Sequence, residues 1–211
     1  MNSLVIPTGL AIALLFVAGL FFVDAFRRSS WNSMRVSDGM IIAALTTFVY
    51  LGHRMSFTLV DGSQLHYLGA AFLAVTLGYC RGLMSMTVVL YFLHDWQHLG
   101  IELIVNAVLP LWLMQVLIQT CKKRLPPNPF IFTLGCGFFG LFLVYAIQLI
   151  TGATLLNVYA SVGGVNLGEL LAYKLILAVG ESTLEGMILV VLVVYLPRAV
   201  SLFDDDYYLS R

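Results

Sequence analysis

Long apolar segments separated by short polar breaks constrain this chain more than any other feature. The first apolar segment extends from Val5 to Val23, and similar segments recur along the whole sequence. A helix of about 20 apolar residues is long enough to cross the hydrocarbon core of a bilayer, at about 1.5 Å per residue. The sequence therefore predicts a protein that crosses a membrane several times.

The composition excludes the main alternatives. Hydrophobic residues make up 60% of the 211 residues and charged residues 10%, whereas a soluble domain has about 45–50% and about 25%. A soluble fold could not cover so much apolar surface with polar groups. The 11 basic and 11 acidic side chains give a formal net charge of zero, without the basic surplus that phosphate binding requires. We therefore exclude a soluble enzyme, a disordered chain and a nucleic-acid-binding protein.

The polar breaks divide the chain into about seven spans. We expect an all-α integral membrane protein, with residues 1–211 forming a single transmembrane domain, one helical bundle. Arg81 and Gly82 separate the third and fourth spans. Residues 121–129 form the strongest break, since they hold three cations followed by three prolines that cannot continue a helix. The expected spans are approximately 5–23, 40–60, 65–80, 83–93, 100–118, 130–150 and 169–196.

Positively charged residues orient this bundle, because cytoplasmic loops carry an excess of Lys and Arg. Seven spans put the two termini on opposite sides. We expect the N-terminus outside and the C-terminus in the cytoplasm, because the outer loops then contain only Arg54. The cytoplasmic loops and tail contain Arg27, Arg28, Arg35, Arg81, Lys122, Lys123, Arg124, Arg198 and Arg211.

The same orientation puts every histidine on the outer side, in one layer with several carboxylates. These residues are His53, His66, His94 and His98, with Asp61, Asp95 and Glu102. Imidazole is the commonest metal ligand and suits nickel, cobalt, copper and zinc, so the layer is suited to capture a divalent cation. Polar side chains also collect at a membrane interface simply because the hydrocarbon excludes them. The sequence leaves both interpretations open, and the segment between His94 and His98 is expected to be a turn.

The last span carries ionisable residues on one helix face. Lys174, Glu181 and Glu185 recur at i, i+7 and i+11. Such groups are costly in a bilayer and usually face a bundle interior or a cavity. Together with Glu102 they form the expected intramembrane polar face. That face either touches a pathway or a partner subunit, or contains a Lys–Glu pair that fixes helix packing.

The sequence contains no catalytic motif. It has no G-x-S-x-G, no H-E-x-x-H and no P-loop. We therefore expect no enzyme activity, no catalytic residues and no intrinsic cofactor. If transport is driven by ATP, the ATPase is another chain. Cys80, Cys121 and Cys136 have no metal-binding spacing and are expected to be small buried hydrophobes.

Two stretches carry a family resemblance: Leu65-His66-Tyr67-Leu68-Gly69-Ala70, and residues 179–209, with an acidic helix, a Tyr-x-Pro exit and a Phe-Asp-Asp segment. The chain resembles the CbiM/NikM-type substrate-capture component of cobalt and nickel energy-coupling-factor transporters. More narrowly, it is similar to a divergent bacterial branch of that family. The resemblance implies a membrane permease for Co²⁺ or Ni²⁺ in the bacterial cytoplasmic (inner) membrane.

The resemblance also implies a metal site, with one departure from the family pattern. Family members hold the ion through the N-terminal amine, a histidine at position 2 and a histidine that opens a later helix. The amine maps onto Met1 and the later histidine onto His66. The position-2 histidine is replaced by Asn2, or by Val5 if Ile6-Pro7-Thr8-Gly9 is aligned with the family's I-P-D-G. His94 or His98 is expected to compensate as a metal ligand.

The expected partners are membrane lipid, an ATPase pair and a transmembrane coupling subunit, with no nucleic acid. The acidic tail 204–206 and the basic loop 122–124 would face the cytoplasmic partners. Two alternatives stay open. One is an accessory membrane protein that derives from the family and has lost metal binding. The other is a small membrane redox protein that uses the outer histidines.

Overall fold

The computed structural model describes residues 6–29, 35–55, 57–58, 64–159, 167–204 and 207–208, and these are almost entirely helical. The strands β1 (Phe57–Thr58) and β2 (Gln64–Leu65) pair as a short antiparallel hairpin. The helices are α1 (Thr8–Arg28), α2 (Val36–Arg54), α3 (Ala70–Leu93), α4 (Trp96–Leu103), η2 (Ile104–Val108), α5 (Leu109–Arg124), η3 (Ile131–Gly140), α6 (Leu141–Tyr159), α7 (Leu167–Tyr195) and η4 (Pro197–Ala199).

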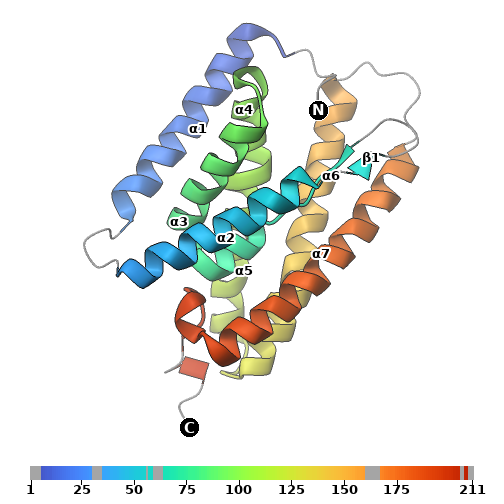
Figure 1. The fold of residues 1–211 in the computed structure, drawn as a ribbon. Coiled ribbons are helices and arrows are strands. Elements are labelled where there is room, and N and C mark those ends of the chain that lie inside the picture. The colour runs from blue at the N-terminus through green and yellow to red at the C-terminus, as the bar shows by residue number, and fades with distance from the viewer. Residues whose placement is uncertain are drawn as a thin grey trace.

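The helices form one bundle with two distinct ends (Figure 1). The upper end holds the starts of α1, α4 and α7 and the end of α6. The lower end, which faces the lower left of the picture, holds the ends of α1, α5 and α7 and the start of α2. The elements α4, η2 and α5 form one continuous helix from residue 96 to 124, and η3 continues directly into α6. The predicted helical membrane bundle is confirmed.

The expected count of seven spans is not confirmed, because α3 counts as one helix by length although its backbone reverses at Gly78. Among the described residues, six helices are long and apolar enough to cross a membrane. The predicted third and fourth spans, 65–80 and 83–93, both fall within α3, which begins only at Ala70. Arg81 and Gly82 are themselves helical, and the break between the two segments lies slightly earlier, at Gly78. The expected turn between His94 and His98 is also wrong in part, because α4 begins at Trp96 and includes His98.

A sharp reversal nevertheless divides α3 at Gly78. Gly78 has φ 78° and ψ 171°, a conformation that is essentially restricted to glycine. A Cβ atom on Gly82 would lie 3.2 Å from the carbonyl oxygen of Leu73. Nine residues of uninterrupted α-helix would put these positions about 13 Å apart. Residues 70–77 and 79–93 are therefore two segments that fold back on each other.

The C-terminal tail completes the first of these segments. At the end of a helix the last carbonyl oxygens have no intrahelical donor. The backbone N–H of Ser201 donates to the carbonyl oxygen of Thr76 at 2.7 Å, and that of Leu202 donates to Val75 at 3.2 Å. Residues 70–77 are buried throughout. This segment therefore lies at the centre of the bundle and ends on the tail.

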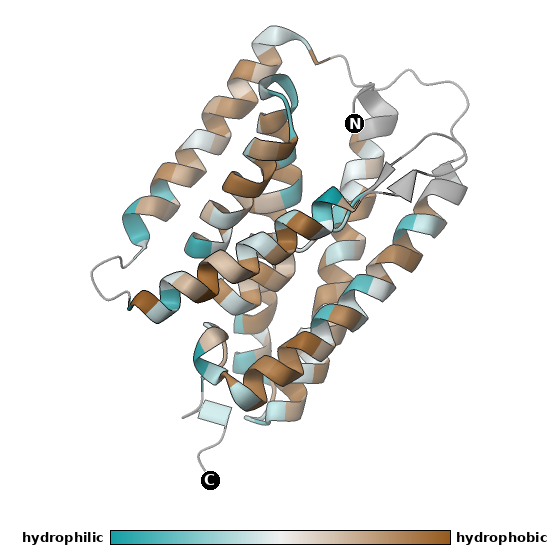
Figure 2. Ribbon diagram, viewed as in Figure 1, coloured by the Kyte–Doolittle hydropathy of each residue, from teal (hydrophilic) through white to brown (hydrophobic). Residues whose placement is uncertain are grey.

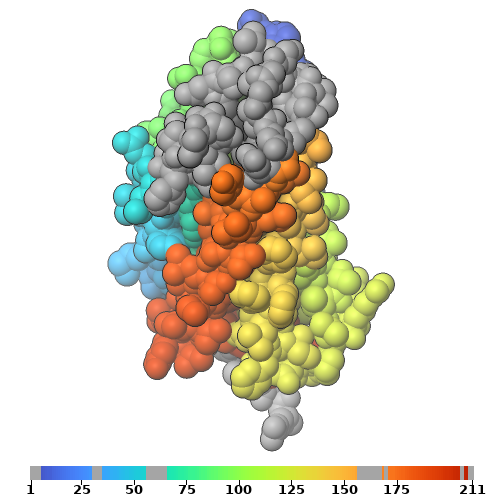
Figure 3. Space-filling view, turned by 90° about the vertical axis from the view of Figure 1, so that its right-hand side faces the viewer, coloured from blue at the N-terminus to red at the C-terminus, as the bar shows by residue number. Residues whose placement is uncertain are grey.

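The surface of the bundle is apolar, as a lipid environment requires. Figure 2 shows hydrophobic residues over most of the length of α1, α2 and α7. Figure 3 shows α7 lying on the outside beside η3 and α6. Helix α1 turns only three small residues inward, Ala11, Ala18 and Ala25, at intervals of seven. The chain is a multi-pass membrane protein.

The positively charged segments gather at the lower end. Basic residues end α1 and α5, and Arg35 precedes the start of α2. The distribution expected from the sequence is thus present, with α1 beginning and α7 ending at opposite ends of the bundle. Which end faces the cytoplasm stays a prediction based on these charges.

Candidate metal-capture site

The segment from His66 to Gly69 joins the β-hairpin to α3 and forms the centre of the candidate site. Gly69 has φ 66° and turns the chain into the helix, where the backbone N–H of Ala70 donates to the carbonyl oxygen of Leu68 at 2.8 Å. A Cβ atom on Gly69 would lie 2.8 Å from side-chain atoms of both Tyr67 and Val49. The close packing and the positive φ together require glycine at this turn.

His66 lies half-buried at the start of this segment. Burial, together with smaller electrostatic contributions from groups that include His94 and Lys174, lowers its pKa from 6.5 to about 4. The imidazole is therefore neutral at pH 7, which is the form that binds metal ions. The same interactions show that His94, at the end of α3, and Lys174, on α7, lie within electrostatic range of His66.

His53 is the most buried histidine of the candidate site. It lies in the last turn of α2 with 8% of its surface exposed. Its ring packs edge-on against Tyr67, with 6.3 Å between the ring centroids. Its Nδ1 atom has no hydrogen-bond partner among the described residues. His66 and His94 lie within electrostatic range of this ring.

The histidines do not form a complete metal site by themselves. Among the described residues, no three His, Cys, Asp or Glu side chains converge in a way that could hold a metal ion. His98 lies half-buried in the first turn of α4. Met1, the expected source of an amine ligand, lies outside the described residues. The described part of the chain thus gathers His53, His66 and His94 in one region without a preformed coordination shell.

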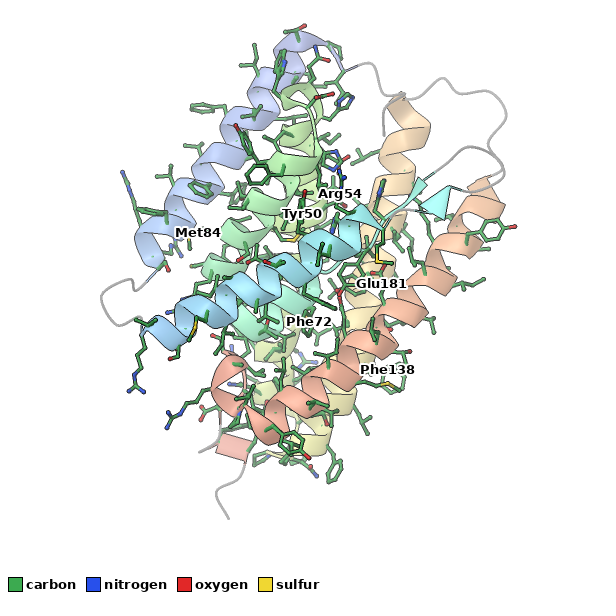
Figure 4. All side chains as sticks on the ribbon, in the orientation of Figure 1. Tyr50, Arg54, Phe72, Met84, Phe138 and Glu181 are labelled. Atoms are coloured by element: carbon green, nitrogen blue, oxygen red, sulfur yellow. The ribbon has the colours of Figure 1, made fainter. Side chains whose placement is uncertain are left out.

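The carboxyl groups of α7 contact the segment that follows His66. Glu185 is fully buried and accepts hydrogen bonds from the Tyr67 hydroxyl at Oε1 and from the Tyr145 hydroxyl at Oε2, the latter at 2.5 Å. Glu181, one turn earlier, is 5% exposed, and its Oε2 accepts the backbone N–H of Leu68 at 2.9 Å. Figure 4 shows Glu181 between α7 and the start of α3.

Glu102 and Lys174 belong to a second polar group, nearer the upper end. Glu102 is 2% exposed and accepts a hydrogen bond from the Asn106 side chain. The Asn106 Oδ1 accepts in turn from the Gln148 Nε2 of α6 at 2.8 Å. Lys174 lies within electrostatic range of Glu102. The expected polar face of the last span therefore divides into two groups. Lys174 lies near Glu102, whereas Glu181 and Glu185 accept hydrogen bonds from a backbone amide and from two tyrosines.

Sequence analysis missed several members of these networks. Asn106 and Gln148 are polar residues inside apolar spans, and that property alone marks them as candidates for buried contacts. Tyr67 and Tyr145 carry no comparable signal, because tyrosine is common in membrane helices and near interfaces. His53 was identified only as one member of an interfacial layer. Its burial and its unpartnered ring nitrogen are properties of the fold.

The comparisons with known proteins identify the family and the fold of the chain. Residues 1–199 match the family CbiM, described as "Cobalt uptake substrate-specific transmembrane region". The chain belongs to the CbiM family. The fold of this CbiM-family protein is similar to that of a solved structure described as "Crystal Structure of an transition metal transporter". The TM-score is 0.63 at 16% sequence identity, over 89% of each chain. A comparison with curated proteins gave no match.

Family membership defines the broad role of this CbiM-family protein. It is a membrane component of transition-metal transport, as the sequence resemblance implied. A transport role also agrees with the prediction that the chain is not an enzyme. CbiM-family proteins act as components of transporters that include partner subunits.

Proposed function

We propose that this CbiM-family protein captures Co²⁺ or Ni²⁺ at its upper end, as the substrate-binding component of an energy-coupling-factor uptake system. The observation that supports this most is the position of His66. It is a neutral, half-buried imidazole within electrostatic range of two further histidines, on a segment held by a buried hydrogen bond. Imidazole ligands favour borderline transition metals over Mg²⁺ or Ca²⁺.

In this proposal His66 supplies the first protein ligand to the entering ion. His53 and His94 supply the nearest additional imidazoles, since both lie within electrostatic range of His66. The amine of Met1 and the ring of His98 remain candidate ligands from the sequence. Water molecules complete the shell around an ion that is bound as cargo and must later be released.

The lower end is the proposed contact surface for an ATPase pair and a transmembrane coupling subunit. Lys122 lies there in the last turn of α5, and its carbonyl oxygen accepts a hydrogen bond from the Tyr207 hydroxyl at 2.8 Å. The Lys122 ammonium group lies 5.8 Å from the ring centroids of Tyr207 and Tyr208. The basic end of α5 and the tail thus form one surface. We place the protein in the bacterial cytoplasmic membrane, with this surface inside.

Metal binding to the purified protein tests the proposal. Isothermal titration with Ni²⁺ and Co²⁺ should show one site per chain, and His66→Ala should weaken it by at least tenfold. Lys123→Ala changes an exposed residue at the opposite end and serves as the control, with unchanged affinity expected. Parallel His53→Ala, His94→Ala and His98→Ala variants rank the remaining imidazoles.

Two results would contradict the proposal. If the wild-type protein binds neither ion, it is not a capture component, and the accessory-protein alternative is favoured. If it binds an ion but His66→Ala has wild-type affinity, His66 is not a ligand and the site lies elsewhere. Bound haem or another redox group in the purified protein would favour the redox alternative.

A further inference from the structure

Glu181 and Glu185 place two carboxyl groups in the interior of the bundle, and the packing of helices does not by itself require them there. Glu181 and Glu185 lie near the middle of α7, and their hydrogen bonds reach residues 113 and 118 positions away in sequence. Burying an ionisable group in an apolar bundle is costly. The contacts of these carboxyl groups therefore indicate what the two residues do.

Both carboxyl groups contact the residues directly after His66. Glu181 accepts from the backbone of Leu68, so this contact fixes the main chain itself. Glu185 accepts from the Tyr67 hydroxyl with one oxygen and uses the other for Tyr145 on α6. One turn of α7 thus holds two consecutive residues of the segment.

The opposite side of the segment is fixed as well. Gly69 turns the chain sharply against Val49 of α2, and residues 70–77 follow as a fully buried helical segment. The position of His66 relative to the bundle therefore depends on short-range contacts at Tyr67, Leu68 and Gly69. Without the two carboxyl groups, α7 would contribute no hydrogen-bond acceptor to this region of the segment.

We infer that Glu181 and Glu185 are positioning residues for the metal ion, which hold the His66 segment in its ion-binding geometry through Leu68 and Tyr67. This inference rests on the proposed function of His66 as a ligand. It assigns α7 a part in substrate affinity, although neither carboxyl group needs to touch the ion. A positional error of about 1 Å in a metal site is enough to weaken it strongly.

The two tyrosines that donate to Glu185 provide a matched test. Tyr67→Phe and Tyr145→Phe each remove one hydroxyl donor from the same carboxyl group. Only Tyr67 belongs to the His66 segment, whereas the Tyr145 hydroxyl also accepts the backbone N–H of Phe72 in α3 at 3.4 Å. Tyr67→Phe should raise the Kd for Ni²⁺ about tenfold, the size expected when one buried hydrogen bond is lost. Tyr145→Phe should lower the melting temperature but leave the Kd within about threefold of wild type.

Glu181 allows a conservative rescue. Glu181→Gln keeps an acceptor for the Leu68 amide, and its NH₂ group takes the place of Oε1, which has no hydrogen-bond partner among the described residues. Glu181→Leu keeps a similar volume but has no acceptor. The Kd for Ni²⁺ should stay near wild type in Glu181→Gln and rise about tenfold in Glu181→Leu. Hydrogen exchange of the Leu68 amide, measured without metal, should accelerate only in Glu181→Leu.

The outcomes separate this inference from the proposed function. If wild-type protein binds no ion, the proposed function fails, while exchange at Leu68 still reports whether α7 holds the segment. If wild-type protein binds Ni²⁺ but both tyrosine variants lose affinity equally, the carboxyl groups act only on stability and the inference is overturned. Equal affinities of Glu181→Gln and Glu181→Leu, or unchanged exchange at Leu68, would overturn it too.

Discussion

Substituting Gly78 by alanine tests the reversal that divides α3. With φ 78° and ψ 171°, Gly78 occupies a region that other residues reach only at a cost of about 1–3 kcal/mol. The new Cβ would also lie 3.3 Å from the Ser201 Oγ, so the tail would have to shift by a few tenths of an ångström. We therefore expect Gly78→Ala to destabilise the protein by about 1–3 kcal/mol.

Gly180→Ala is the matched control on α7. It introduces the same methyl group, but no atom lies within 4 Å of the new Cβ, and Gly180 has an ordinary helical backbone. Alanine should stabilise this helix by about 0.5–1 kcal/mol relative to glycine. Thermal unfolding in detergent, followed by loss of the monodisperse peak, should rank Gly180→Ala above wild type and wild type above Gly78→Ala. Equal melting temperatures for Gly78→Ala and wild type would refute the reversal at this residue.

Three further substitutions test packing and tail contacts. Gln148→Leu should cost about 1–3 kcal/mol, because it leaves the half-buried Asn106 Oδ1 without its 2.8 Å donor. An unchanged melting temperature would argue against this network. Gly186→Leu should lower the melting temperature more than Gln148→Leu, since a Cβ at position 186 would lie 2.9 Å from the Gly137 carbonyl oxygen. A variant with wild-type stability would show that α7 and η3 are not in close contact. Tyr207→Phe removes the hydrogen bond to the backbone at the end of α5 and should speed limited proteolysis of the tail. An unchanged cleavage rate would show that this hydrogen bond does not hold the tail on α5.

The sequence was sufficient for the membrane bundle because hydrophobic span length is a strong local signal. It was less reliable for α3, where the charged Arg81 and the adjacent Gly82 suggested the break. The reversal lies at Gly78, where the backbone takes a conformation that favours glycine. The sequence does not distinguish a glycine within a helix from a glycine at such a reversal. The β-hairpin was missed because its two-residue strands are too short to show alternation.

The candidate site could be predicted only as a set of residues. The common face of Lys174, Glu181 and Glu185 followed from helical periodicity, but their partners did not. Tyr67 and Leu68 are more than 100 residues away from the carboxyl groups they contact. Such pairings depend on how helices pack, and one sequence does not encode them in any local pattern. The nearness of His53 to His66 is of the same kind.

The backbone amides of Ser201 and Leu202 give the tail a structural role within the protein itself, independent of any partner. They complete the carbonyl ends of a helix that stops inside the protein, at Val75 and Thr76. If this part of the tail were displaced, the carbonyl oxygens of Val75 and Thr76 would lose their hydrogen-bond donors in an interior that contains little water. A hydrogen-bond acceptor without a donor costs several kcal/mol there. We therefore expect the backbone around Ser201 and Leu202 to stay in place when the protein assembles with other subunits, and we expect a chain truncated before Ser201 to be destabilised even without any partner.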